Sequence, residues 1–269
     1  MSPSPGNRRV ALVSGAARGN GLAIAEALAR TGATVYLADI GHDLPEVPYP
    51  MSSAADLERA AEGLRDIHQR VHALQCDVRS PEDVAAAVRV VESEAGRLDI
   101  LVNNAGVLVL NPVEKVSTAE WDVHMDVIVK GAFLLCQAAL PGMNQRGWGR
   151  VINIASVAAH RGLGTGVAYT AAKHAMIGLT RALAMEVARQ NVTVNAVCPG
   201  TTPTELVHGV GRTLDMSPEE TLAIFSQRHL TQKPIAKEDV AAATVWLASD
   251  AAGRVNGTSL FVDDGWHCH

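Results

Sequence analysis

The sequence predicts an α/β fold, a doubly wound parallel sheet of about seven strands with helices on both faces. Short apolar runs rich in Val, Ile and Leu alternate along the chain with segments whose apolar residues recur at helical spacing. The apolar runs are continuous rather than interrupted by polar residues, which is typical of strands covered on both faces. A repeated strand–helix order needs right-handed crossovers and therefore gives parallel strands.

The first unit of this order runs from residue 10 to residue 39. VALVS, residues 10–14, is predicted to be a strand, and a glycine-rich turn follows it. The helix after the turn should end at Gly32, because glycine readily adopts the backbone conformation of a helix C-terminus. TVYLAD, residues 34–39, is the second predicted strand. The apolar face of the helix consists of Leu22, Ala25, Leu28 and Ala29.

The same alternation continues to the end of the chain, so we expect a single domain over residues 1–269. Ser80 and Asp83 resemble a capping box, and a Ser-x-x-Glu pattern at Ser117 opens a long helix. Further strands are expected at residues 71–77, 98–106, 149–156, 192–200 and 259–265. Further helices are expected at residues 54–70, from 80 onward, at 117–143, 168–190, near 217–220 and at 238–248.

Composition excludes several classes of protein. The net charge of -5 argues against a nucleic-acid surface, which needs clustered Lys and Arg. The apolar runs look too short to cross a bilayer, and residues 1–8 read as a flexible polar leader rather than a signal peptide. The four cysteines lie far apart without a Cys-x-x-Cys pair. We therefore expect reduced thiols in a cytoplasmic protein and no metal site.

Residues 41–53 form an unusual connection after the second strand. Pro45, Pro48 and Pro50 keep this segment extended, and it is longer than the few residues that usually join a strand to a helix. Two interpretations stay open, namely a tolerated surface insertion and a flap beside the adenosine end of a cofactor. The flap interpretation follows from the position of the segment, which starts where the second strand stops.

The turn Ser14–Gly21 lies between a strand and a helix. Glycines there let the backbone approach a pyrophosphate, and the helix N-terminus offers free N–H groups to it. Asp39 ends the second strand, eighteen residues after Gly21. Its carboxylate can accept hydrogen bonds from the ribose hydroxyls of NAD and would repel the 2′-phosphate of NADP. Arg18 could contact that phosphate, but the carboxylate should dominate, so the sequence predicts NAD as the cofactor.

Five motifs together resemble those of a known family. In chain order they are Ser14–Gly21, Asn103–Gly106, Ser156, Tyr169-x-x-x-Lys173 and Pro199–Gly200. With them, nearly the whole chain resembles the classical short-chain dehydrogenase/reductase family. The resemblance implies a Rossmann fold, a nicotinamide cofactor and a homotetramer.

Three features refine this resemblance. Ser14 stands where the family commonly has threonine, which keeps a hydroxyl group. Ile128 stands where the family has an asparagine that bends the long helix and helps to hold a water behind the lysine. That water is then either lost or held by backbone carbonyl groups. Residues 41–53 also resemble the insertion of the carveol-dehydrogenase-like, mycofactocin-linked subgroup, in which a loop helps to cover tightly bound NAD.

Tyr169 and Lys173 lie one helical turn apart, and Ser156 precedes Tyr169 by thirteen residues. A solvated helix face would explain the spacing, but the flanking motifs favour an activated phenol. Tyrosine ordinarily has a pKa of about 10. A neighbouring ammonium favours the phenolate, so we expect Lys173 to lower the pKa of Tyr169 and make it a general acid/base. Ser156 would then bond the substrate oxygen and stabilise charge on it.

The resemblance also assigns residues to the cofactor. They follow predicted strands, where ligands of parallel sheets bind. Asp77 and Val78 would lie at the adenine, and Thr204 near the nicotinamide and phosphate. The whole set is Ser14, Gly15, Arg18, Gly19, Asn20, Gly21, Asp39, Asp77, Val78, Asn104, Ala105, Gly106, Tyr169, Lys173, Pro199, Gly200 and Thr204.

The sequence therefore predicts an NAD-dependent oxidoreductase that interconverts a secondary alcohol and its ketone, with no nucleic-acid or membrane partner. Two alternatives stay open. A nucleotide-binding relative with impaired catalysis is favoured by Ile128, and an NADPH-dependent ketoacyl-type reductase is opposed by Asp39. Residues 201–230 form the expected substrate loop, whose polar residues His208, Arg212 and His229 do not identify the substrate.

Two further segments near the expected site have open interpretations. His160 and Arg161 either line the substrate mouth or belong to a solvated loop. The tail Trp266–His269 resembles a metal cluster but lacks a fourth ligand nearby in the sequence. We expect the tail to pack across a subunit interface or near a neighbouring active site.

Overall fold

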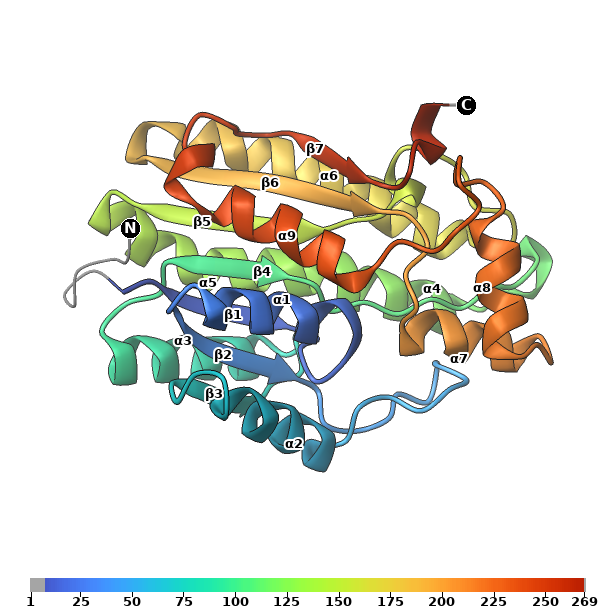
Figure 1. The fold of residues 1–269 in the computed structure, drawn as a ribbon, viewed down its shortest axis with the longest axis horizontal. Coiled ribbons are helices and arrows are strands. Elements are labelled where there is room, and N and C mark those ends of the chain that lie inside the picture. Colours follow the sequence, from blue (N-terminus) through green and yellow to red (C-terminus); the bar gives the residue numbers. More distant parts are fainter. Residues whose placement is uncertain (1–7, 269) are drawn as a thin grey trace.

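A computed structural model describes residues 8–268 of the chain. In that range seven strands form one sheet with the order β3-β2-β1-β4-β5-β6-β7, and every neighbouring pair is parallel. The predicted fold class is therefore confirmed (Figure 1). The strands are β1 Val10–Ser14, β2 Thr34–Asp39, β3 Val71–Gln75, β4 Ile100–Asn103, β5 Gly149–Ile154, β6 Val192–Pro199 and β7 Ser259–Val262.

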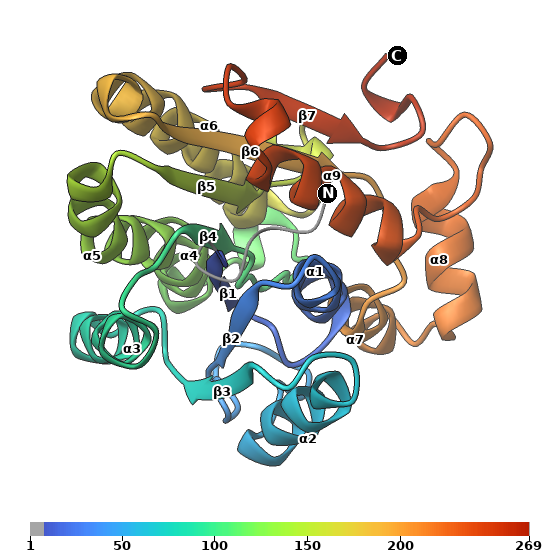
Figure 2. The same ribbon diagram turned by 60° about the vertical axis from the view of Figure 1, so that its left-hand side comes forward.

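Helices cover both faces of the sheet (Figure 2). One face carries α1, α2 and α9, where Ile24, Leu57 and Val240 belong to one buried apolar cluster. The other face carries α3, α5 and α6 around a second cluster that includes Val88 and Leu135. The helices are α1 Gly19–Arg30, α2 Ala54–Arg65, α3 Pro81–Ala95, α4 Thr118–His124, α5 Gly131–Arg146, α6 Val167–Val187, α7 Glu205–Thr213, α8 Pro218–Ser226 and α9 Lys237–Ala248.

Three helix predictions need correction. The helix expected over 54–70 ends at Arg65. The long helix expected over 117–143 is divided by the π-helical turn Met125–Lys130 between α4 and α5. Residues 201–230 contain two helices rather than one, because α7 precedes α8. Gly209 and Gly211 give α7 a low helix propensity, which hides it in the sequence.

The helix caps explain where several of these helices begin. Ser217 and Glu220 form a reciprocal capping box at α8. At α3, Ser80 accepts the Asp83 N–H at 3.1 Å as expected. The Asp83 carboxylate, however, accepts the backbone N–H of Asp77 at 3.1 Å rather than that of Ser80. The cap therefore also fixes the residues that follow β3.

The continuous helical stretch Thr118–Arg146 is long and apolar enough to cross a membrane by length and composition, which the expectation of short apolar runs missed. Its most apolar window is 56% buried inside the protein. Leu135 and Met143 of α5 lie in the core cluster between the sheet and α6. This helix is therefore a core element of the domain.

Residues 41–53 run along the surface but are docked on the domain, which favours the flap interpretation over a tolerated surface insertion. Leu44 and Tyr49 are buried in the core. The Tyr49 hydroxyl donates to the Leu108 carbonyl and accepts the Leu108 N–H, both at 3.0 Å. Its ring packs against Gly209, where an added Cβ would lie 2.6 Å from Tyr49 Cγ. The insertion thus connects the segment after β4 to α7.

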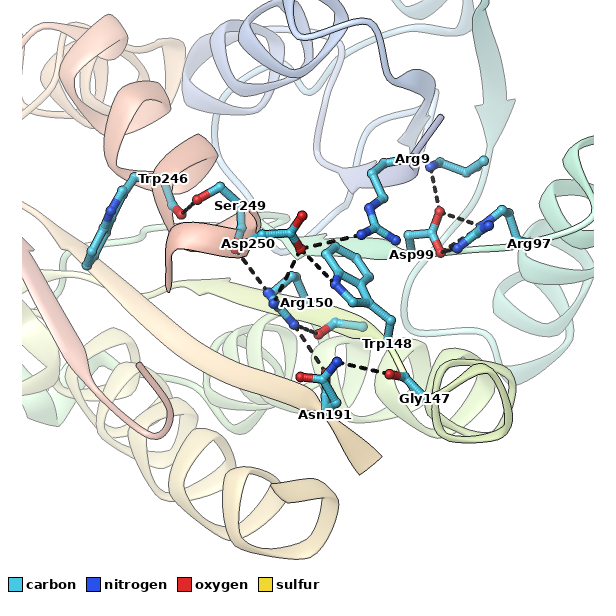
Figure 3. Close-up of polar contacts among 12 residues, drawn as sticks. Arg9, Arg97, Asp99, Gly147, Trp148, Arg150, Asn191, Trp246, Ser249 and Asp250 are labelled. Atoms are coloured by element: carbon cyan, nitrogen blue, oxygen red, sulfur yellow. Dashed lines mark hydrogen bonds and ion pairs between the residues drawn. The ribbon is translucent and has the colours of Figure 1, made fainter. Parts of the chain in front are cut away.

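A polar cluster ties together the amino-terminal edge of the sheet (Figure 3). Arg150, at the start of β5, is 2% exposed and donates Nη1 to the Asn191 carbonyl at 3.2 Å. The guanidinium carbons of Arg150 and Arg9 lie 4.3 and 3.4 Å from the Trp148 ring centroid. The Trp148 indole N–H donates to Asp250 at 2.9 Å. These contacts join the chain before β1, β5 and β6 to the segment after α9.

Candidate active site

The glycine turn between β1 and α1 has the conformation that its sequence requires. Gly15 and Gly19 both have a φ of +62°, which other residues rarely adopt. An added Cβ on Gly21 would lie 2.1 Å from the Gly15 carbonyl oxygen. The Ser14 hydroxyl accepts the N–H groups of Asn104 and Ala105 at 3.0 and 3.2 Å. Ser14 therefore fixes the end of β4 against the end of β1.

A first cavity lies at the carboxyl ends of β1, β2, β3 and β4. Ser14 and Gly21 stand behind the turn, outside its lining, and shape it indirectly. The insertion supplies part of its wall through Tyr49, Met51 and Ser52. The other residues that the sequence assigns to the cofactor at this end line it directly, namely Gly15, Arg18, Gly19, Asn20, Asp39, Asp77, Val78, Asn104, Ala105, Gly106 and Thr204.

Asp39 is 8% exposed and faces this cavity. Its carboxylate accepts the Ala17 N–H at 2.9 Å and also the Ser52 hydroxyl of the insertion. Arg18 donates Nη2 to the Pro50 carbonyl at 2.8 Å, so the insertion holds this guanidinium as well. The insertion therefore fixes both charged groups that bear on the choice of cofactor.

Ser156, Tyr169 and Lys173 line a second cavity beside the first. The Ser156 hydroxyl, just after β5, accepts the Ala158 N–H at 3.1 Å. Tyr169 lies in the first turn of α6 and Lys173 in the next. Lys173 Nζ donates to the Ile154 carbonyl at 2.8 Å and lies 5.6 Å from the Tyr169 ring centroid. The second cavity is also lined by the predicted residues Asn20, Asn104, Gly106, Pro199, Gly200 and Thr204.

Burial dominates the electrostatics of this pair. It raises the pKa of Tyr169 to about 12, although a hydrogen bond with Ser156 acts in the opposite direction. Burial also lowers the pKa of Lys173 to about 8. The pKa of Tyr169 in the chain alone is therefore raised rather than lowered as expected, because burial removes the hydration of the phenolate.

Two buried histidines lie near the site, and of these His124 was missed by sequence reasoning. His124 Nδ1 bonds the Glu120 carbonyl at 2.7 Å, so its Nε2 is free to accept the Val109 N–H at 3.1 Å. The His124 ring meets the Tyr169 ring edge-on, with centroids 6.4 Å apart. His124 therefore supports Tyr169 and the segment after β4 at once. A lone histidine in a helix gives no sequence signal of such a role.

His229 supports the other side of the second cavity. Its Nε2 accepts the Thr201 N–H at 3.0 Å, and its Nδ1 bonds the Lys233 carbonyl. An added Cβ on Gly200 would lie 2.4 Å from His229 Nε2. His229 therefore packs directly on the backbone that follows β6, from a position within the expected substrate loop.

Ile128 lies in the π-helical turn between α4 and α5 and is fully buried. The Gly131 N–H donates to the Asp126 carbonyl, five residues earlier, as a π turn requires. A Cβ on Gly106 would lie 3.9 Å from Lys173 Nζ and 4.0 Å from Ile128 Cγ1. The helix therefore departs from regular α-helical geometry behind Lys173 without an asparagine side chain.

The tail folds back onto the second cavity of its own chain. Trp266 lines the cavity, and Arg161 donates Nη2 to the His267 carbonyl at 2.9 Å. His267 Nδ1 bonds Asp263 at 2.9 Å. Within residues 8–268, no cluster of three or more His, Cys, Asp or Glu side chains could hold a metal ion. The last expected tail residue, His269, lies outside the described residues.

The chain is similar to known proteins along nearly its whole length. Residues 15–267 match a family model described as "Enoyl-(Acyl carrier protein) reductase". The chain is 34% identical to D-beta-hydroxybutyrate dehydrogenase of Rhizobium meliloti, over 96% of this chain and 98% of that protein. It is 38% identical to D-threitol dehydrogenase of Mycolicibacterium smegmatis, over 96% and 92%.

A solved structure agrees with these relatives. Carveol dehydrogenase from Mycobacterium avium, in complex with NAD, superposes with a TM-score of 0.90 and 32% identity, covering 97% of this chain and 98% of that one. Such proteins are oxidoreductases that act on alcohols. The chain therefore belongs to the classical short-chain dehydrogenase/reductase family.

Proposed function

We propose that this chain interconverts a secondary alcohol and its ketone with NAD(H), using Tyr169 as general acid/base and Ser156 and Lys173 as its partners. One observation supports this above all. The first and second cavities share lining residues, namely Asn20, Asn104, Gly106, Thr204 and Leu206. The two cavities therefore form one crevice, with Asp39 at one end and Tyr169 at the other.

The residues of this crevice fit a dinucleotide. The glycine turn leaves no room for a Cβ at Gly21, and Gly15, with a φ of +62°, lines the first cavity. The Asp39 carboxylate has the hydrogen-bond acceptors that ribose hydroxyls need. When bound, the nicotinamide accepts a hydride from the alcohol carbon or returns one to the ketone.

The protein then handles the proton. Its raised pKa keeps Tyr169 protonated near neutrality, which is the form that donates a proton to the substrate oxygen in reduction. In oxidation, the phenolate form of Tyr169 takes the hydroxyl proton, and this form becomes more abundant as the pH rises toward the pKa of about 12. Ser156 donates a hydrogen bond to the same oxygen and stabilises the charge that develops there. Lys173 is fixed by the Ile154 carbonyl and retains further N–H groups for the cofactor ribose and the proton path.

Asp39 supports NAD rather than NADP, and this choice can be tested by mutation. Asp39→Asn removes the charge that would repel a 2′-phosphate. We expect kcat/KM with NAD to fall by about 10-fold or more and the NADP/NAD ratio to rise by at least that factor, since bonds to charged groups contribute about 1.5–3 kcal/mol. Measurement of NADH and NADPH absorbance in steady state checks this. Asp122→Asn, an exposed change on α4, is the matched control.

An unchanged cofactor ratio in Asp39→Asn would exclude Asp39 as the selecting residue. A wild-type preference for NADPH would instead favour the alternative of an NADPH-dependent ketoacyl-type reductase; the matching family model is described as a reductase of an acyl carrier protein substrate. The choice of cofactor and the use of Tyr169 are independent, so failure of one does not remove the other.

We further propose that NAD stays bound during gel filtration, as in the carveol-dehydrogenase-like, mycofactocin-linked subgroup. The docked insertion supports this, because Tyr49, Met51 and Ser52 wall the first cavity and Tyr49 is anchored on both sides. The 260 nm to 280 nm absorbance ratio of the eluted protein measures retained nucleotide. Cofactor that exchanges within seconds would contradict the proposal.

A cytoplasmic homotetramer remains our proposal for the assembly. Its support is the presence of large apolar side chains on the outer faces of α5 and α6, since Phe133 is 44% and Met185 83% exposed. Light scattering of the purified protein measures the subunit number. A monodisperse monomer at micromolar concentration would refute it.

A further inference from the structure

The second cavity is strongly cationic. Arg161, Lys173 and Arg228 line it, and among residues 8–268 no Asp or Glu belongs to its lining. The chain as a whole has a formal net charge of -5, so this local excess of positive charge runs against the average of the molecule. Cavity walls of low dielectric focus the electric field of these charges, so the cavity attracts ligands of opposite charge.

The two arginines stand at a different part of the cavity from Lys173. Lys173 is 4% exposed and bonds the Ile154 carbonyl beside Tyr169. Arg161 lies in the segment between β5 and α6 and is partly buried, while Arg228 follows α8 and is exposed. The arginines therefore belong to the loop walls near solvent, and the lysine belongs to the reacting end.

Neither arginine forms an ion pair within the part of the chain that the structure describes. Arg161 donates Nη2 to the His267 carbonyl at 2.9 Å, a neutral acceptor that leaves its other N–H groups available. By contrast, Arg212 of α7 lies 3.6 Å from the Glu205 carboxylate, and Arg79 lies 2.7 Å from Asp77. Within the described residues, the charges of Arg161 and Arg228 are therefore not neutralised by a carboxylate and stay available to a ligand in the cavity.

Apolar side chains from three segments also line the second cavity. Leu108 comes from the segment after β4, Leu206 and Val207 from α7, and Phe225 from α8. A ligand that reaches from Tyr169 to the arginines must therefore present an apolar middle. Arg212, which also belongs to the expected substrate loop, is outside the lining and already paired with Glu205.

From this arrangement we infer that the substrate is a secondary alcohol or ketone with an apolar body and a terminal carboxylate, which Arg161 and Arg228 bind. The inference rests on the proposed function of the same site. A guanidinium matches a carboxylate in shape and charge, and such bonds are stronger than neutral ones. The carboxylate takes no part in the reaction, since the bond changes occur at the carbinol carbon and its oxygen.

The test compares methyl-ketone acids with their neutral amides. The acids are 4-oxopentanoate, 5-oxohexanoate and 7-oxooctanoate, which vary the length of the apolar middle, and each is paired with its primary amide. NADH oxidation is followed at 340 nm. We expect kcat/KM for the best acid to exceed that of its amide by about 10- to 100-fold, as a charge-assisted bond would give. The advantage should shrink as ionic strength rises, because the exposed Arg228 is screened.

Three variants assign the preference to residues. Arg228→Gln and Arg161→Gln should each raise KM for the acid about 10-fold with little change in kcat, because they are remote from the chemistry. Turnover of the amide should stay the same, which excludes a general loss of folding. Arg212→Gln is the matched control on the neighbouring helix and should keep the full preference for the acid.

Equal turnover of acids and amides would overturn the inference, as would a preference that survives both Arg161→Gln and Arg228→Gln. If neither series reacts, the proposed function is in question rather than the anion site. Calorimetry with Tyr169→Phe and 5-oxohexanoate then decides. Binding of the acid at least about 10-fold tighter than the amide supports the inference, and equal binding overturns it.

Discussion

Lys173 is a charged group in a buried place. It is 4% exposed, its ammonium bonds one backbone carbonyl, and burial lowers its pKa to about 8 from an ordinary 10.5. Tyr169 beside it is buried as well, and its pKa is raised to about 12. Both shifts favour the neutral form of the side chain, because burial removes the hydration of the phenolate and of the ammonium. A charged Lys173 at neutral pH is therefore held at the expense of stability.

Tyr169→Phe removes the hydroxyl and little else. We expect turnover to fall by at least about 100-fold, the usual contribution of a general acid/base, while NAD affinity by calorimetry stays within a factor of about two. In the wild type, oxidation should rise with pH across the alkaline range, because the phenolate fraction grows toward a pKa of about 12. Near-full turnover in Tyr169→Phe would remove this residue from the mechanism.

Lys173→Met tests how the buried ammonium affects the stability of the fold. In the folded chain, Lys173 loses its proton at a lower pH than lysine in the unfolded chain. The buried ammonium therefore lowers the free energy of unfolding by its full amount below about pH 8, and this destabilisation fades between about pH 8 and pH 10.5. A pKa shift of this size corresponds to a destabilisation of about 3 kcal/mol, which the variant removes. The variant also leaves the Ile154 carbonyl without its partner, which costs about 1 kcal/mol. The variant should therefore be inactive yet more stable at pH 7.

Urea unfolding of the cofactor-free proteins from pH 7 to 10.5 measures this difference. The gap between the variant and wild type should close as pH rises. Lys130→Met, at a half-exposed residue paired with Asp126, should show no such trend. A wild type that is more stable than Lys173→Met at pH 7 would show that the ammonium stabilises the fold.

The residues of the crevice differ in how far sequence could reveal them. Tyr169 and Lys173 share one helix turn, so a short pattern finds them. His124 gains its role only by meeting Val109 and Tyr169, which fold against it from other segments. Tyr49 likewise depends on Leu108, fifty-nine residues away. Such roles come from tertiary contacts and have no local signature.

At the scale of elements, the insertion 41–53 and α7 act as one unit. Tyr49 is wedged between the Leu108 backbone and Gly209, and both elements contribute to the wall of the first cavity. The contact requires glycine at position 209, because a methyl group there would overlap the aromatic ring. A movement of α7 would therefore displace the insertion.

Gly209→Ala tests this unit. Alanine usually stabilises a helix by about 0.5–1 kcal/mol relative to glycine, but here its Cβ would lie 2.6 Å from Tyr49 Cγ. We expect Tyr49 to be displaced, the NAD dissociation constant to rise about 10-fold, and nucleotide to be lost on gel filtration, as for about 1.4 kcal/mol of lost contact. Gly178→Ala in α6 meets nothing within 4 Å and is the matched control. Unchanged NAD retention in Gly209→Ala would separate α7 from the insertion.

The periodicity of apolar residues predicted where strands and helices lie better than it predicted where a helix is interrupted. Strands and most helices follow from continuous apolar runs and helical spacing, and these are set by local sequence. The π turn Met125–Lys130 is invisible in the apolar pattern, because one extra residue in a turn leaves the buried face intact. The helix α7 was missed because its two glycines weaken the local signal, while packing on Tyr49 stabilises it.

At the scale of the whole molecule, the two edges of the sheet have different tasks. The carboxyl edge holds both cavities. The amino edge holds the cluster around Arg150, whose guanidinium bonds backbone carbonyls and stacks on Trp148 (Figure 3). Because parallel strands place all their carboxyl ends together, catalysis and this part of the stability are separated in space.

Arg150→Ala should therefore destabilise the protein without altering its chemistry. It leaves buried carbonyls without a donor and removes the packing on Trp148, so we expect a loss of about 2–4 kcal/mol in the free energy of unfolding. The kcat and KM of the folded variant should match those of the wild type. The exposed Arg189→Ala should stay within about 0.5 kcal/mol of the wild type. A change in kcat for Arg150→Ala would show that the edges are coupled.

The four thiols of the chain are not equivalent. Burial raises the pKa of Cys76 and Cys136 to about 12 and that of Cys198 to about 11, so alkylating reagents near neutral pH leave these three unmodified. Cys268 is exposed, two residues after Trp266 at the mouth of the second cavity. A maleimide dye would therefore attach at one position, and its emission would record ligand entry in real time on the unmutated enzyme.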